Sequence, residues 1–329
     1  MVGPIQAAPS TDNSAAGWPP DLALYHGDEE RGTRCFGAVV SLLYGGQTLR
    51  YRSASPDVAL EVAGPRLAFV VDDATPCAAE ILCEIGPVEC SSSPLLFQAG
   101  TSWAARAPDA LHEEICYGPD RSGGRGPWAR LRHDNHLSCF EFRLAPRERN
   151  DVFQVGFPTD EYIVARRLAR SNGLVLHASS LLQDGLAYLF LGHSGAGKST
   201  TAMNAVTVGA EVLSDDRTIV VMEPDGTARA WGTPWHGSFR RATNASAPIA
   251  GIFVIAQDSA ERLTPIGPAR AIGEAFVRLI HPTPHAWEVE LTLDTLERLV
   301  AAAPIAELRQ RPTAAGYLEA RRFAEAARR

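Results

Sequence analysis

Short apolar or alternating runs occupy the chain from about residue 34 to residue 145, with Gly, Pro, Ser and Asp between them. Runs of this length, separated by turn residues, are typical of β-strands. The expected strands are 35–44, 58–62, 67–71, 95–98 and 137–144, and residues 76–85 are expected to form a short helix. The first half of the chain is therefore predicted to be β-rich, as a small sandwich or a sheet.

The pattern changes at Thr159, after which helical and extended segments alternate. Thr159 is expected to cap a helix at 162–171, with Asp160 and Glu161 in its first turn. Further strands are expected at 174–182, 186–191, 210–213, 218–222, 227–231 and 249–257, and further helices at 200–208, 270–280, 293–302 and 317–327. Tight turns at 183–185 and 224–226 predict two hairpins.

This order of elements predicts the α/β fold class and two domains. A β-rich N-terminal domain is expected at residues 21–158, and a second domain with C-terminal helices at residues 159–329. Residues 1–20 are rich in Ala, Pro, Ser and Asn and are predicted to be disordered.

A glycine-rich segment between the strand 186–191 and the helix 200–208 carries the clearest chemistry. Gly192, Gly197, Lys198 and Ser199 match the phosphate-binding pattern G-x-x-x-x-G-K-[ST]. Glycines let consecutive backbone N–H groups turn around an anion, and the start of a helix adds partial positive charge. Lys198 is expected to reach the β- and γ-phosphates, and Ser199 to ligate Mg²⁺. The expected nucleotide-binding residues are Gly192, His193, Ser194, Gly195, Ala196, Gly197, Lys198, Ser199 and Thr200.

Two neighbouring carboxylates follow the strand 210–213. Asp215 and Asp216 stand where the carboxyl end of a strand faces the ligand crevice of an α/β sheet. Adjacent residues point in different directions, so one can hold Mg²⁺ while the other takes a proton from an acceptor hydroxyl. The alternative is a turn that only caps the strand. His177, within an apolar strand, is either a core residue or a group that steadies the transferring phosphoryl.

The segment 231–237, Trp-Gly-Thr-Pro-Trp-His-Gly, has two interpretations. Trp235 or His236 can lie over the nucleotide or the acceptor, or the aromatic rings can anchor a loop on the core. Arg240 and Arg241 follow directly and are either solvated or able to stabilise the charge on a transferring phosphate.

Composition excludes some classes of function. The net charge is −7, from 31 basic and 38 acidic residues, which argues against nucleic acid as the main partner. No apolar run approaches the ~20 residues that span a bilayer, and no secretory signal pattern is present. None of the six cysteines forms a C-x-x-C pair, so no zinc site is expected. We expect reduced, mostly buried thiols in a cytoplasmic protein.

Three elements together resemble the HPr kinase/phosphorylase superfamily, serine kinases whose P-loop fold is related to that of phosphoenolpyruvate carboxykinase. These elements are Leu176-His177-Ala178, residues 192–199 and Leu213-Ser214-Asp215-Asp216. The resemblance covers about residues 160–310. It implies an α/β P-loop kinase core of this type joined to the β-rich N-terminal domain, with ATP and Mg²⁺ as cofactors.

The resemblance also implies roles for individual residues. Asp215, Asp216, His177 and Lys198 are the implied catalytic residues, and Ser199 and Asp216 are the implied metal ligands. Asp215 is our choice of general base, with Asp216 as metal partner and His177 positioning the phosphate.

The chain departs from the bacterial kinases of this superfamily at several positions. Ala178 replaces a usual glycine, Thr200 replaces a usual glutamate, and no Arg-Gly-rich C-terminal motif is found. Phosphorylase activity and HPr as substrate are therefore not expected. The whole chain looks more like diverged HPr-kinase-like proteins with a β-rich N-terminal domain. Some of these accompany peptide-modifying gene clusters, including lasso peptide clusters, and phosphorylate a peptide serine.

The sequence thus favours an ATP-dependent kinase that acts on a serine or threonine hydroxyl of a protein or peptide. A non-catalytic ATP-binding sensor and a small-molecule kinase are the alternatives. A transport or motor ATPase is disfavoured because no Leu-Ser-Gly-Gly-Gln element is present. The identity of the acceptor and a homo-oligomeric state stay open.

Overall fold

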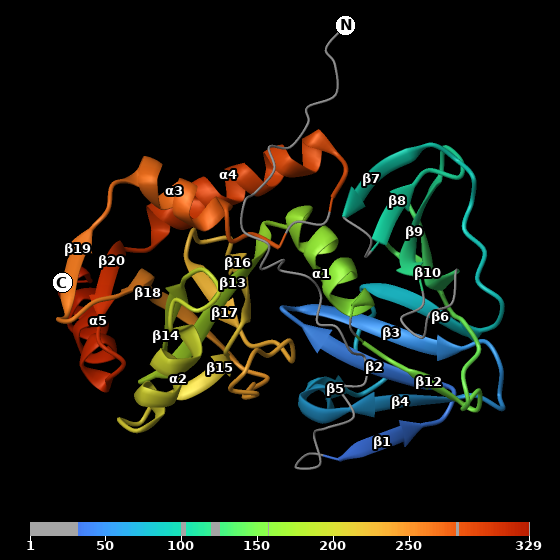
Figure 1. Cartoon of the computed structure of the whole chain (residues 1–329), viewed down its shortest axis with the longest axis horizontal. Helices are drawn as coiled ribbons and strands as arrows, with labels where there is room; N and C mark the ends of the chain where they lie inside the picture. Colours follow the sequence, from blue (N-terminus) through green and yellow to red (C-terminus); the bar gives the residue numbers. More distant parts are fainter. Residues whose placement is uncertain (1–31, 100–102, 120–125, 157, 281–282, 329) are drawn as a thin grey trace, which may run out of the picture.

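The computed structural model describes residues 32–99, 103–119, 126–156, 158–280 and 283–328. The N-terminus that was expected to be disordered, residues 1–20, lies outside these ranges. Figure 1 shows two sheet-bearing parts side by side, with helix α1 between them. The protein is of the mixed α/β class and rich in sheet.

The N-terminal strands form two sheets. The three-stranded sheet has the order β1-β4-β12, and the nine-stranded sheet has the order β5-β2-β3-β6-β11-β10-β9-β8-β7. The bounds are β1 Thr33–Phe36, β2 Val39–Tyr44, β3 Gln47–Ser53, β4 Ala59–Ala63, β5 Val70–Val71, β6 Ala79–Ile85, β7 Leu95–Ala99, β8 Trp103–Arg106, β9 His112–Pro119, β10 Pro127–Asp134, β11 Cys139–Leu144 and β12 Val152–Gln154. The predicted β-rich character of residues 34–145 is confirmed.

Two predictions in this half are wrong. Residues 76–85 do not form a helix, because β6 runs parallel to β3 and β11 in the middle of the large sheet. Its side chains alternate, with Ala79, Ile81 and Cys83 buried and Leu82 exposed, which is the period of a strand. Most of the strand predicted at 67–71 is instead a 3₁₀ helix at Gly64–Phe69, which has a proline in its first turn.

The prediction that all six cysteines are reduced is wrong for one pair. Cys90 and Cys116 form a disulfide, with their Cα atoms 6.1 Å apart. A separation of this size permits the bond, but a gap of 26 residues in sequence does not reveal it. The carboxylate of Glu114 lies within 4.8 Å of both sulfur atoms. The free thiols are Cys35, Cys77, Cys83 and Cys139; of these four, Cys83 is buried and the other three are exposed, so the prediction of mostly buried thiols is also wrong.

The second half follows the predicted alternation closely. Its elements are α1 Thr159–Ala169, β13 Gly173–Gln183, β14 Leu186–Leu191, α2 Lys198–Val206, β15 Glu211–Ser214, β16 Arg217–Met222, β17 Ala228–Trp231, β18 Ser246–Gln257, β19 Arg262–Pro265, α3 Pro268–Phe276, α4 Ala286–Ala302, β20 Ile305–Gln310 and α5 Ala314–Ala327. Both predicted hairpins are present, β13–β14 and β16–β17. Thr159 is the first helical residue, so its predicted role as the N-cap is wrong, and Pro158 occupies that position.

Two long strands hold this half together. The first part of β13 pairs with β16 and the second part with β14, while β18 pairs first with β17 and then, in parallel, with β14. Side chains of β14 alternate between two cores. Leu189 packs with α3 and α4, and Tyr188 and Phe190 pack with α2 and α5. Figure 1 shows these helix pairs on opposite sides of the sheet. The glycine loop therefore begins at the carboxyl end of β14, a strand of a sheet that is covered by helices on both faces.

Helix α1 packs into the core of the N-terminal strands. Tyr162, Ile163 and Leu168 of α1 belong to the same buried cluster as Tyr44 and Tyr51. Among the described residues, no helix is long and apolar enough to cross a membrane.

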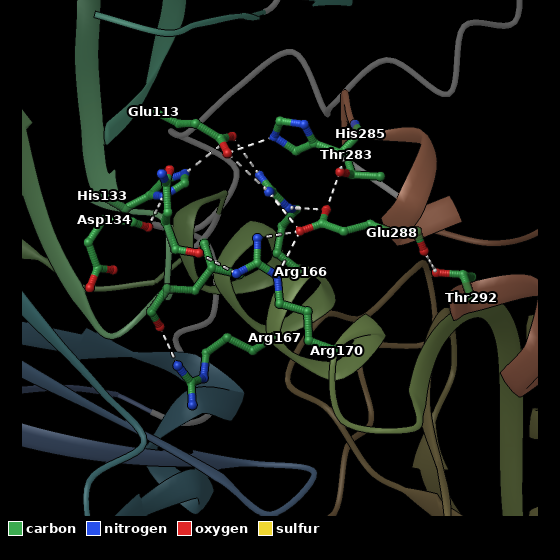
Figure 2. A network of polar contacts seen from close by, with 12 residues as sticks. Glu113, His133, Asp134, Arg166, Arg167, Arg170, Thr283, His285, Glu288 and Thr292 are labelled. Atoms are coloured by element: carbon green, nitrogen blue, oxygen red, sulfur yellow. Dashed lines mark hydrogen bonds and ion pairs between the residues drawn. The ribbon is translucent and has the colours of Figure 1, made fainter. Parts of the chain in front are cut away.

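A buried network of charges also joins α1 to its neighbours, as Figure 2 shows. Arg166 of α1 donates to Glu113 of β9 at 3.0 Å and to Glu288 of α4 at 2.9 Å. His285 contacts the other oxygen of Glu113 at 2.7 Å, and Arg170 donates to Glu288. Arg166 and Glu288 are almost fully buried, so each charge depends on the others for compensation.

Candidate functional site

The glycine loop turns sharply between β14 and α2. Gly195 and Gly197 have φ angles of +79° and +105°, a conformation that glycine adopts at little cost. No side chain caps α2, which begins at Lys198 with Gly197 as its N-cap. Apart from the neighbouring residues in the chain, no atom of the described residues would lie within 4 Å of a Cβ on either glycine. The loop and the uncapped helix start therefore leave room and N–H donors for an anion.

Lys198 is held against the loop that precedes it. Its side chain is buried, and Nζ donates to the carbonyl oxygens of Gly192 at 2.9 Å and His193 at 3.3 Å. Burial lowers the pKa of Lys198, while the carboxylate of Asp216 acts in the opposite direction. Two of the three ammonium donors are thus used by the loop, which fixes where the charge lies.

The other predicted loop residues lie at its rim. His193, Ser194 and Gly195 are exposed, whereas Ala196 is buried. The imidazole Nδ1 of His193 lies 2.6 Å from the carbonyl oxygen of Ser194. Ser199 and Thr200 are half-buried in the first turn of α2.

His177 and Asp216 are in direct contact. Nε2 of His177, on β13, lies 2.9 Å from Oδ1 of Asp216, in the turn between β15 and β16. The guanidinium of Arg217 pairs with the other oxygen of Asp216. Burial alone would raise the pKa of Asp216, but the hydrogen bond with His177 and the charges of Arg217 and Lys198 lower it. The carboxylate of Asp216 is therefore in contact with an imidazole and a guanidinium, and the charge of Lys198 also acts on it.

Asp215 faces a different partner. It is 1% exposed, and its two oxygens accept the backbone N–H groups of Gly237 at 2.7 Å and Phe239 at 2.8 Å. Burial raises the pKa of Asp215 by more than these hydrogen bonds lower it. A Cβ on Gly237 would lie 3.3 Å from both Asp215 Oδ2 and Asp216 Cβ, so this loop approaches the two acids closely.

The segment 231–237 serves partly as an anchor. Trp235 is 2% exposed, and its ring lies 5.4 Å from that of Tyr44 in the N-terminal sheet. For Trp235 this favours the core interpretation. Arg240 and Arg241 are both exposed, and Arg241 lies over the ring of Phe239.

Two residues that support the acidic pair were not predicted from sequence. Arg217 lies next to Asp216 in sequence, so the run Asp-Asp-Arg was a usable signal. Its Nε donates to Glu161 of α1 at 2.5 Å, and Glu161 is 1% exposed. Burial raises the pKa of Glu161, against the lowering effect of Arg217. No local pattern pointed to Glu161, because the contact bridges 56 residues.

Comparisons with known proteins give limited similarity. A family model described as SynChlorMet cassette protein ScmC matches residues 143–287, less than half of the chain. Among solved structures, the HPr(Ser) kinase/phosphatase from Coxiella burnetii matches at 10% identity, over 46% of this chain and 95% of that one, with a TM-score of 0.26. No curated protein matches the chain.

Proposed function

We propose that this chain is an ATP-dependent kinase of the HPr-kinase-like type. In this proposal it transfers the γ-phosphoryl group to a serine or threonine hydroxyl of a protein or peptide, with Mg²⁺. The observation that carries the proposal is the contact of His177 with Asp216 beside the buried Lys198. We also propose that residues 159–329 are a P-loop kinase core and that residues 21–158 are a β-rich domain attached to it.

The residues present fit a nucleotide with its metal ion. The positive φ angles of Gly195 and Gly197 and the open space beside them suit a phosphate chain, which residues 192–200 would hold. Ser199 and Asp216 would hold Mg²⁺, since hydroxyl and carboxylate oxygens are its preferred ligands. A bound Mg²⁺ ion neutralises charge on phosphate oxygens.

Each charged group then has a role in the transfer. Lys198 binds the β- and γ-phosphates. Asp215 takes the proton of the acceptor hydroxyl, and its raised pKa suits a group that accepts a proton. Each of its oxygens accepts one backbone N–H, which leaves a further lone pair on each. His177 positions the phosphoryl group and orients Asp216.

A non-catalytic ATP-binding sensor is the second candidate. It is favoured by the two backbone hydrogen bonds of Asp215, which also suit a carboxylate that only holds the loop 237–239. A small-molecule kinase would use the same chemistry as the first proposal. We also propose that the protein is cytoplasmic and that its partner is neither a nucleic acid nor a membrane.

One experiment separates these candidates. The full chain is incubated with γ-labelled ATP, Mg²⁺ and an extract of its host, and the labelled product is identified. A labelled protein or peptide supports the kinase, and a labelled small molecule supports the variant. ATP binding without any labelled product would favour the sensor, and no ATP binding would overturn all three.

A further inference from the structure

Residues 278–280 add a short strand-like contact to the edge of β13. Leu279 forms an antiparallel bridge with Leu176. The N–H of His177 donates to the carbonyl oxygen of Arg278 at 2.7 Å, and the N–H of Ile280 donates to that of Val175. In this pattern Arg278 lies directly opposite His177.

On its other edge β13 pairs with β16, and there His177 lies opposite Arg217. Residues directly opposite each other in antiparallel strands project from the same face of a sheet. Arg278, His177 and Arg217 therefore form a row on one face. Asp216 contacts two members of this row, His177 and Arg217.

One nitrogen of the Arg278 side chain has no hydrogen-bond partner among the described residues. Burial lowers the pKa of Lys198, and the positive charges of Arg278 and Arg217 lower it further. The side chain of Arg278 is 12% exposed, and its Nη1 donates to the carboxylate of Glu274 at 2.8 Å and to the carbonyl oxygen of the same residue at 2.5 Å. Its Nε is buried and has no hydrogen-bond partner within the described part of the chain. Such a donor is costly to leave unsatisfied, so a shift of the side chain that brings it an acceptor is favoured.

Arg217 and Arg278 differ in the carboxylates with which they form ion pairs. Arg217 forms ion pairs with both Glu161 and Asp216. Arg278 forms an ion pair with Glu274, which lies four residues earlier in the chain. An arginine opposite His177 supplies a planar set of donors that matches phosphate oxygens.

We propose that Arg278 binds the terminal phosphate of the nucleotide, in the role that the sequence offered to Arg240 and Arg241. The assignment rests on the proposed function, since it needs a triphosphate in the Gly192–Lys198 loop. A group that contacts only the terminal phosphate distinguishes ATP from ADP. The acceptor plays no part in this recognition.

The test measures the dissociation constants of ATP and ADP, both with Mg²⁺, for the full chain by calorimetry. Arg278→Gln is expected to weaken ATP binding about tenfold and ADP binding less than about twofold, as for a lost charge-assisted hydrogen bond. Arg270→Gln is the matched control, because Arg270 lies on α3 but is half exposed and pairs with Glu307. That variant is expected to bind both nucleotides as the wild type does.

Surviving ADP binding also shows that Arg278→Gln is folded. If it does not fold, the same ratio is measured for Arg278→Lys, which keeps the charge but loses the planar donors and is expected to weaken ATP binding selectively. Unchanged ATP affinity, or equal losses for ATP and ADP, would overturn the assignment while leaving the proposed function intact. A wild-type chain that binds neither nucleotide would overturn both.

Discussion

His177 and Asp216 are 39 residues apart in sequence, and their side chains meet at 2.9 Å between β13 and the turn after β15. The contact ties the histidine to the acidic pair, and this hydrogen bond and the charges of Arg217 and Lys198 lower the pKa of Asp216. It gives the imidazole a defined orientation, because one ring nitrogen is committed to the carboxylate.

Lys198→Ala is expected to remove most nucleotide binding. The variant loses the buried ammonium that the carbonyl oxygens of Gly192 and His193 hold in position. An affinity loss of about tenfold or more is expected, as for a charge-assisted contact. Calorimetry with ATP and Mg²⁺ measures it, with Arg322→Ala on the exposed face of α5 as control. Wild-type affinity in Lys198→Ala would contradict the phosphate role of this residue.

Asp215→Asn is expected to abolish transfer while ATP affinity stays within about threefold of wild type. An amide cannot take the hydroxyl proton. Transfer is followed with labelled ATP and the identified acceptor. Asp225→Asn is the control, because Asp225 lies in an exposed turn, where it accepts hydrogen bonds from Thr227.

The same substitution is expected to loosen the loop that Asp215 holds. An amide NH₂ group opposite the N–H of Gly237 or Phe239 cannot accept its hydrogen bond, which costs about 1–3 kcal/mol. Chemical denaturation measures this loss separately from activity. Transfer retained by a folded Asp215→Asn would exclude Asp215 as the base.

Glu288→Gln is expected to lower the free energy of unfolding by about 3–5 kcal/mol, because it leaves the buried Arg166 without one of its two carboxylates. Urea denaturation measures the change. Glu297→Gln, on the exposed face of the same helix, is expected to change it by less than about 0.5 kcal/mol. Equal effects of the two substitutions would show that the network of Figure 2 contributes little to stability.

Stability is expected to fall as the pH drops from about 6.5 to 4, because of His133. Burial lowers the pKa of His133 to about 4, whereas histidine in an unfolded chain has a pKa of about 6.5. In this window the unfolded chain binds a proton that the folded chain does not, so the free energy of unfolding decreases with falling pH. The difference between the two pKa values corresponds to about 3 kcal/mol.

Neighbouring groups do not cancel this effect. Burial alone would raise the pKa of Glu113, but Arg166 lowers it to about 2, so Glu113 stays ionised above pH 4. His133→Gln is expected to flatten the dependence of unfolding on pH between 6.5 and 4, and the exposed His136→Gln is not. Identical slopes for wild type and His133→Gln would contradict a buried neutral imidazole.

The local sequence pattern predicted secondary structure correctly where turns and helix starts depend on neighbouring residues. The glycine loop, the hairpin turns at 183–185 and 224–226, and the alternation after Thr159 all depend on contacts within a few residues. The strand β6 was mistaken for a helix because its alternation is short and its partners β3 and β11 are distant in the chain.

Sequence singled out His177 and Asp216 one by one but not Arg217, Glu161 or Arg278, and the contacts among these residues depend on packing. His177 reaches Asp216, Arg217 reaches Glu161, and Arg278 lies opposite His177 because β13 is paired on both edges and covered by α1. The pairing of Cys90 with Cys116 and the charges between Arg166 and Glu288 arise in the same way, across 26 and 122 residues. Short-range backbone preferences act within a turn or a strand, whereas the free energy of burying apolar faces decides which distant segments come together.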